Sequence, residues 1–255
     1  MATIAVNPLS SLTKKYLMAI SGLVLVGFVL GHMLGNLQVY PVFGGEEGFN
    51  AYAYKLHNLP YNILWVIRGF LLACLVVHVW VAVLLVLENR RARPENYRAQ
   101  DYVQASYSSR TMRWTGPILL AFIIYHLLHF TVRVGPGAEY GDSELHPDVP
   151  LMKDGHKVVD YVEPTSGEVV YKMTHDAYGM VISGFSSWPV SIFYIISMAL
   201  LCLHLSHGVS SMFQSLGLRN KEWRKRLDRF AISYGWVVFL GFISIPIAVL
   251  TKAIS

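Results

Sequence analysis

The sequence predicts an all-α membrane protein with five transmembrane helices and a small β-hairpin insertion on the outer side. Three observations lead to this fold class. The 255-residue chain is 54% hydrophobic and only 15% charged, with a mean hydropathy of +0.42, which is unusually apolar for a soluble domain of this length. Five apolar runs are each roughly 20 residues long, the length that a helix needs to cross a bilayer. The positive charges gather at one end of these runs.

The five apolar runs cover residues 17–37, 61–87, 114–132, 190–213 and 230–250. The first follows Lys14 and Lys15, as in a signal peptide, but it is too long and lacks a small-residue cleavage pattern, so we expect it to be retained. Pro117 is expected in the first turn of the third helix, where its missing N–H costs little. The whole chain, 1–255, is treated as one transmembrane domain.

An outer insertion over residues 135–187 separates the third and fourth runs and carries most of the acidic residues. Within it, two alternating segments at 157–162 and 168–173 flank a five-residue loop that ends in Gly167. A loop of this length with a terminal glycine is typical of a hairpin. The insertion is therefore expected to contain the β-hairpin.

The charge distribution predicts the topology. Fourteen of the 21 Lys and Arg residues lie in the N-terminal lead and in the loops at 88–113 and 214–229, with five acidic residues. The other side holds seven Lys and Arg with eleven acidic residues. Because positive loops stay cytoplasmic, the N-terminus is expected inside and the C-terminus outside. The net charge of +5 then reflects topology, and no nucleic-acid partner is expected.

Four of the runs each carry a histidine well inside the membrane, where an ionisable group is expensive and needs a function. At 1.5 Å per residue, His32 lies roughly 25 Å and His126 about 20 Å from the cytoplasmic end of its helix. The same rise puts His78 and His204 about 15 Å from theirs. The histidines sort into an outer pair, His32 with His126, and an inner pair, His78 with His204.

Two imidazoles that face each other across a four-helix bundle suit a six-coordinate haem iron, with the porphyrin in the apolar interior. Zinc would need four ligands at one depth. The alternative for each histidine is a hydrogen bond to a neighbouring carbonyl, or a place on a proton path in a haem-free proton-coupled transporter. His129 and His207 each lie three residues beyond a ligand candidate, so each is a reserve ligand or a neighbour of a propionate or quinone.

A recurrent spacing supports the haem interpretation. Ser21-Gly22 precedes His32, and Thr115-Gly116 precedes His126, at the same offsets of eleven and ten residues. Eleven residues make about three helical turns, so each hydroxyl shares the face of its histidine at the level of the inner pair. There a hydroxyl could bond a propionate, and a glycine could let a flat macrocycle approach the backbone. The alternative is small residues at ordinary helix contacts.

These residues resemble the di-haem cytochrome b membrane-anchor subunit of succinate:quinone and fumarate:quinone oxidoreductases, of the five-helix, single-anchor type. The resemblance covers all five runs and excludes the outer insertion. It depends on Ser21-Gly22 with Gly31-His32, Gly48-Phe-Asn50 followed by Asn58-Leu-Pro60, His78, Arg113-Trp-Thr-Gly116 with Tyr125-His126, and His204-Leu-Ser-His-Gly208 with Leu216-Gly217. The sequence departs from the better-known members in its outer insertion, in His129 and in His207.

The resemblance implies two haem b groups, with the outer and inner histidine pairs as axial ligands. It also implies a flavoprotein subunit and an iron–sulphur subunit on the cytoplasmic face of a bacterial cytoplasmic membrane. Electrons would pass through the haems to or from menaquinone or ubiquinone. The chain itself has no GxGxxG fingerprint and no cysteine cluster, so the dicarboxylate chemistry belongs to other subunits. A cytochrome b of another quinone-linked dehydrogenase is the alternative.

Candidate groups for quinone and proton handling are few. Glu47 and His57 are the main candidates, and Glu46 and Tyr52 lie near them in the sequence. Arg68 is expected to pair a propionate of the outer haem. Arg113 is a further candidate cofactor contact.

Overall fold

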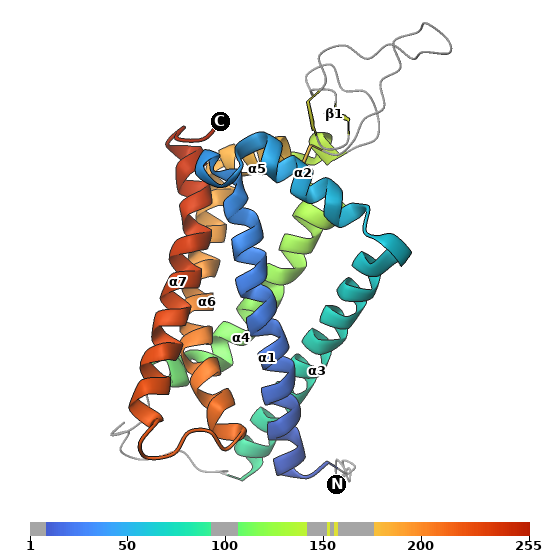
Figure 1. The fold of residues 1–255 in the computed structure, drawn as a ribbon. Helices are drawn as coiled ribbons and strands as arrows, with labels where there is room; N and C mark the ends of the chain where they lie inside the picture. Colours follow the sequence, from blue (N-terminus) through green and yellow to red (C-terminus); the bar gives the residue numbers. More distant parts are fainter. Residues whose placement is uncertain (1–8, 93–106, 142–151, 154–155, 158–175) are drawn as a thin grey trace, which may run out of the picture. The chain divides into compact units, whose positions relative to one another are not determined.

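The structure, a computed structural model, describes residues 9–92, 107–141, 152–153, 156–157 and 176–255. Its long helices are α1 (Ser11–Asn36), α3 (Ile63–Arg91), α4 (Tyr107–Leu127), α6 (Trp188–Ser215) and α7 (Arg224–Leu250), drawn in Figure 1. Each is long and apolar enough to cross a membrane. The prediction of a multi-pass, all-helical protein with five spans is confirmed at this level.

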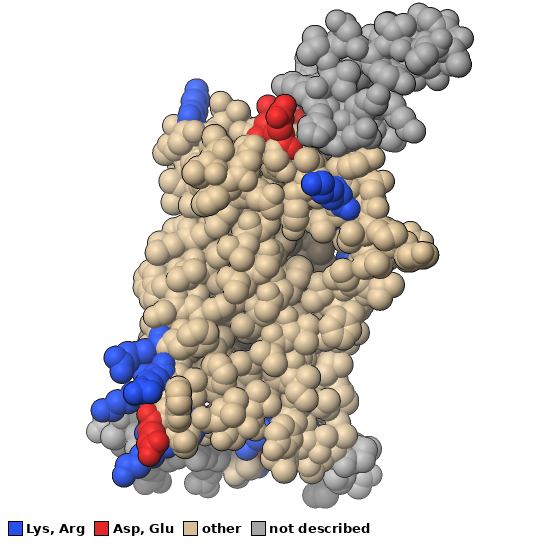
Figure 2. Space-filling model, viewed as in Figure 1, with Lys and Arg blue, Asp and Glu red and all other residues tan. Residues whose placement is uncertain are grey.

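The surface of α3 shows why these helices need lipid. Of its 29 residues only Val81 is fully buried, and about half of its leucine, valine and isoleucine residues, among them Ile67, Leu72 and Val76, are exposed. An exposed apolar surface of this extent is not stable in water. Figure 2 shows the visible helix surface as mostly uncharged, with Lys and Arg gathered around the start of α7.

The third span differs from expectation at both ends. It begins at Tyr107, so Pro117 lies inside α4 and not in its first turn, because the polar residues before Trp114 continue the helix. At the other end α4 passes into a π-helical turn, η4 (Leu128–Val132), and Arg133 stops it in a left-handed conformation with φ 67°. A π turn inside a helix often marks a functional position.

The chain divides into two compact units, which are described separately. The first comprises Met1–Val29, Ile67–Pro117 and Leu201–Val237, and the second comprises Leu30–Val66, Ile118–Leu200 and Val238–Ser255. The inner histidine pair belongs to the first unit and the outer pair to the second.

Small and medium apolar residues of α1, α6 and α7 form the core of the first unit. Ala19, Val209, Met212 and Ala231 are buried against one another. The Tyr234 hydroxyl donates to the Val26 carbonyl at 2.6 Å, which joins α7 to α1. A buried Lys14 forms an ion pair with Glu88, which joins α1 to α3.

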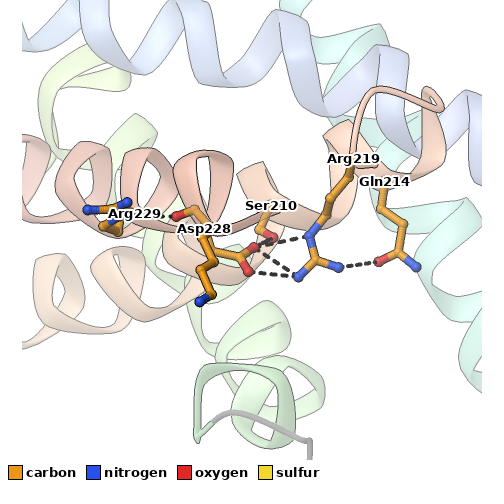
Figure 3. A network of polar contacts seen from close by, with 6 residues as sticks. Ser210, Gln214, Arg219, Asp228 and Arg229 are labelled. Atoms are coloured by element: carbon orange, nitrogen blue, oxygen red, sulfur yellow. Dashed lines mark hydrogen bonds and ion pairs between the residues drawn. The ribbon is translucent and has the colours of Figure 1, made fainter. Parts of the chain in front are cut away.

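Polar contacts close the turn between α6 and α7 (Figure 3). Asp228 accepts hydrogen bonds from the Arg219 guanidinium through both carboxylate oxygens, at 2.8 and 2.9 Å from Nη2, and from the Ser210 hydroxyl. Arg219 also donates to Gln214 at 3.5 Å. A two-oxygen contact of this kind is geometrically specific, so Asp228 fixes the start of α7 against the end of α6.

Replacing Asp228 with Ala should therefore loosen this turn. Arg219 and Ser210 both lose their acceptor, and because the site is partly open to solvent we expect a loss of about 1–2 kcal/mol in the free energy of unfolding. Denaturant titration in detergent micelles measures it. Glu222→Ala, on an exposed residue of the same segment, is the control. Equal stability of the two variants would contradict this role.

Two short helices that the sequence analysis did not predict lie side by side in the second unit (Figure 1). They are α2 (Gly45–His57), inside the connection after the first span, and α5 (Ala177–Ser186), before the fourth. Asn50 of α2 donates to Asp176 at 3.0 Å and accepts from the Tyr178 amide at 2.9 Å. Asp176 caps α5 by accepting from the Gly179 amide at 2.9 Å. The two helices are therefore joined by buried polar groups.

Tyr52 of α2 lies against α1. A Cβ placed on Gly35 would meet the Tyr52 hydroxyl at 2.6 Å. The Tyr52 ring can pack here because Gly35 has no side chain.

The predicted β-hairpin is not supported. Almost all of its residues, 157–173, lie outside the described part of the chain. The strands that the structure describes are only two residues long, β1 (Met152–Lys153) and β2 (His156–Lys157), and they pair antiparallel with each other. They precede the proposed hairpin and overlap it only at Lys157.

Candidate functional site

The inner pair meets in the first unit. His78 comes from α3 and His204 from α6, and their ring centroids are 6.5 Å apart with an interplanar angle of 57°. Both imidazoles lie inside apolar helices, where a neutral ring that keeps one nitrogen lone pair free is a good metal ligand.

A hydroxyl fixes the orientation of His78. The Ser21 Oγ donates to the Leu17 carbonyl at 2.7 Å and lies 3.3 Å from Nδ1 of His78. Since its proton is used on the carbonyl, its oxygen accepts from the imidazole. We therefore assign the proton of His78 to Nδ1, which leaves the lone pair of Nε2 free.

His204 is held in the same way. The Thr115 hydroxyl donates to the Met112 carbonyl and lies 3.3 Å from Nδ1 of His204. Ser21 and Thr115, which were predicted to contact propionates, thus contact the imidazoles of the inner pair directly. Hydrogen bonds of this kind orient metal-binding histidines and set which nitrogen is free.

The outer pair meets in the second unit. His32 of α1 and His126 of α4 have ring centroids 5.8 Å apart and an interplanar angle of 81°. Phe242 lies 5.9 Å from the His32 ring and Phe122 stacks 5.8 Å from the His126 ring. Aromatic side chains therefore lie beside both members of this pair.

The separation within each pair fits one metal ion between two axial imidazoles. A bond from a metal to an imidazole nitrogen is about 2 Å long and the nitrogen lies roughly 1.1 Å from the ring centre, so two axial rings place their centres about 6 Å apart. The observed 5.8 and 6.5 Å lie on either side of this value. Rotation about the metal–nitrogen bonds leaves the interplanar angle free. The two separations are therefore compatible with axial ligation of one iron by each pair.

His129 is placed differently from the pairs. It is 2% exposed, its Nδ1 lies 3.0 Å from the Tyr194 hydroxyl, and its Nε2 lies 3.0 Å from the Pro136 carbonyl oxygen. Both ring nitrogens are thus engaged by the protein, which leaves His126 as the ligand candidate of α4. His207 is half-buried on α6 and lies within electrostatic range of His204 and Arg219.

The remaining predicted cofactor contacts are scattered. A Cβ on Gly22 would lie 3.4 Å from Cε1 of His78, whereas one on Gly116 would meet no atom within 4 Å. Gly22 therefore admits the imidazole, and Gly116 borders open space. The Arg113 guanidinium lies 5.9 Å from the Trp114 ring centre. Arg68 belongs to the first unit, not to the unit that holds the outer pair.

The structure does not bring Glu47 and His57 together. They lie in the first turn and at the last residue of α2, and ten residues of helix span about 15 Å. Glu47 is exposed, and Nδ1 of His57 donates to the Ala53 carbonyl at 2.8 Å. Burial, with smaller contributions from Glu46 and Asp176, raises the pKa of the Tyr178 phenol. Glu46, rather than Glu47, is therefore the acid that faces the junction of α2 and α5.

Within the described residues, no group of three or more His, Cys, Asp or Glu side chains is arranged to hold a metal ion. A site with two protein ligands, such as a haem iron, is not of that kind. No protein-family model, curated protein or solved structure matches the chain. The geometry of the histidines therefore has to carry the assignment of function.

Sequence reasoning missed Tyr194, whose hydroxyl lies 3.3 Å from Nδ1 of His126. A signal for it was present. Tyr194 precedes His204 by ten residues on α6, close to the three-turn offset that relates Ser21 to His32 and Thr115 to His126. Each of the helices α1, α4 and α6 thus carries one histidine that is a ligand candidate. Each also carries a hydroxyl, ten or eleven residues earlier, that contacts a ligand candidate of another helix.

Proposed function

We propose that the chain is a membrane-anchor cytochrome b subunit that binds two haem b groups and belongs to a succinate:quinone or fumarate:quinone oxidoreductase. One observation supports haem binding, and the resemblance described above supports the choice of a succinate or fumarate enzyme. Two pairs of imidazoles from different helices face each other with ring centroids 5.8 and 6.5 Å apart. In three of these imidazoles the Nδ1 side is occupied by a hydroxyl, which favours Nε2 as the ligand atom.

His78 and His204 would hold one iron, and His32 and His126 the other. A bound haem b supplies a one-electron carrier whose potential depends on its ligands and surroundings. The residues of this chain would orient the ligands. Ser21, Thr115 and Tyr194 contact the imidazoles, and aromatic side chains pack against the outer pair.

The partners are those that the resemblance implies, and the composition and charge of the chain are compatible with them. With no GxGxxG fingerprint and no cysteine cluster, it needs a flavoprotein subunit and an iron–sulphur subunit to oxidise succinate or reduce fumarate. The positive loops support a cytoplasmic face, where those subunits would dock. Menaquinone or ubiquinone would be the substrate of this chain within a bacterial cytoplasmic membrane.

Glu47 tests the proton-handling part of the proposal. Its carboxylate is exposed in the first turn of α2, open to a quinone that enters from the membrane. Glu47→Gln should lower quinone turnover by about 10-fold or more, the scale of general acid–base catalysis, and leave both haems in place. Glu46→Gln, one residue away, is the matched control. Wild-type turnover in Glu47→Gln would remove Glu47 from the mechanism.

The proposal is tested on the purified complex by a haem assay with a dithionite-minus-oxidised spectrum. Two b-type haems per chain are expected. A haem-free protein would refute the cytochrome assignment and return the histidines to proton transfer. Identification of the co-purifying subunits separates a succinate or fumarate enzyme from another quinone-linked dehydrogenase, since only the former brings a dicarboxylate-active flavoprotein.

A further inference from the structure

A chain of hydrogen bonds connects the outer pair to the backbone of the second unit. Nδ1 of His126 lies 3.3 Å from the Tyr194 hydroxyl, which lies 3.0 Å from Nδ1 of His129. Nε2 of His129 lies 3.0 Å from the Pro136 carbonyl oxygen. Tyr194 is 6% exposed and His129 2% exposed, so water does not compete for these contacts.

The direction of this chain is determined by its last member. A carbonyl oxygen only accepts, so Nε2 of His129 donates to Pro136. A buried imidazolium without a counter-charge is costly, so His129 is neutral and its Nδ1 accepts from the Tyr194 hydroxyl. The Tyr194 oxygen is then left to accept from Nδ1–H of His126. His126 is thereby fixed in the tautomer whose Nε2 lone pair is free.

The surrounding backbone is shaped around His129. The residue lies in the π-helical turn η4 (Leu128–Val132), and a Cβ on Gly184 would come within 3.1 Å of its Nε2. A side chain at 184 would therefore crowd the imidazole where it reaches Pro136.

We propose that Tyr194, backed by His129, is a positioning residue that sets the tautomer of His126 and makes the outer haem site electronically distinct from the inner one. This inference depends on the proposed function. In the inner pair the contacting hydroxyls of Ser21 and Thr115 donate to backbone carbonyls. Tyr194 instead donates to an imidazole nitrogen within a buried chain, where successive hydrogen bonds strengthen one another.

Removing the acceptor on Nδ1–H makes an imidazole less basic, and a less basic ligand stabilises the oxidised, more highly charged iron less well. In Tyr194→Phe the outer site should therefore become easier to reduce. We expect its reduction equilibrium to shift by up to about tenfold, which is about 59 mV for a one-electron couple. The inner site should not change.

The measurement is a spectroscopic redox titration of the purified complex, in which the two haems titrate as separate waves. Tyr125→Phe is the matched control, because Tyr125 packs 6.0 Å from the Tyr194 ring and 5.6 Å from His129 and its hydroxyl forms no hydrogen bond within the described residues. One wave should move to higher potential in Tyr194→Phe and neither in Tyr125→Phe. Unchanged waves, or equal shifts in both variants, would overturn the inference.

His129→Leu provides an independent measurement if Tyr194→Phe does not accumulate. Without its acceptor, the Tyr194 hydroxyl turns to donate to Nδ1 of His126, which moves the imidazole proton to Nε2 and blocks ligation there. Haem content should then fall from two toward one per chain. Two haems with unaltered potentials would overturn the inference. A haem-free unaltered protein would instead refute the proposed function, so the two failures are distinguishable.

Discussion

Under the proposed function, the His204→Ala variant is expected to bind one haem b per chain in place of the two expected for the unaltered protein. His204 faces His78 at a ring-centroid distance of 6.5 Å, so alanine removes one of two axial ligands of the inner site and leaves the Thr115 hydroxyl without its imidazole contact. The outer pair comes from other residues of other segments and keeps both its ligands. Loss of one ligand of two lowers affinity far more than loss of a hydrogen-bonded neighbour, which costs about 10–100-fold.

Haem content per chain and the amplitude of the reduced-minus-oxidised spectrum measure this effect. His207→Ala is the matched control, since it removes a half-buried imidazole three residues further along α6, and no ring pair joins His207 to another histidine among the residues that the structure describes. That variant should keep two haems. If His207→Ala loses a haem and His204→Ala keeps both, the choice of ligand on α6 is wrong and the inner pair has to be reassigned.

The second large effect is expected on stability, at Asp176. Its carboxylate is 2% exposed and accepts from Nδ2 of Asn50 and from the Gly179 amide. Asp176→Ala removes the cap of α5 and leaves a buried amide of α2 without its acceptor. The two losses together should lower the free energy of unfolding by about 2–4 kcal/mol.

Asp176→Asn separates hydrogen bonding from charge. Both contacts are made by Oδ1, and an asparagine oxygen accepts in the same place and caps a helix about as well. Thermal or denaturant unfolding in micelles should therefore place Asp176→Asn close to the unaltered protein and Asp176→Ala well below it. Equal losses in both variants would mean that the negative charge, and not the network, holds α2 and α5 together.

The five spans could be predicted because hydrophobic length is a local property of the sequence. Their ends could not, since Tyr107 and the residues after it are polar and still continue α4 into what was expected to be a loop. The short helices α2 and α5 were not predicted from the sequence for a related reason. Ten to thirteen residues with mixed polarity give a weak periodic signal, and the Asn50–Asp176 contact that joins them is separated by 126 positions.

The histidine pairs could be anticipated from depth alone, because a helix rises by a fixed distance per residue. The groups that orient the histidines could be anticipated only in part. The three-turn offset picked out Ser21 and Thr115, yet it suggested propionates as their partners, because which residue a hydroxyl meets depends on how neighbouring helices are rotated. For the same reason the role of His129, set by Tyr194 and Pro136, emerges only from the folded chain.

The packing of α3 has a consequence for assembly in the cell. Val81 is its only fully buried residue, and its ties in the first unit include the Lys14–Glu88 ion pair and the Ser21–His78 hydrogen bond. His78 is also a proposed iron ligand. Under the proposed function, haem binding would add a further tie between α3 and its neighbours, so newly inserted chains that lack haem should be cleaved faster by membrane proteases.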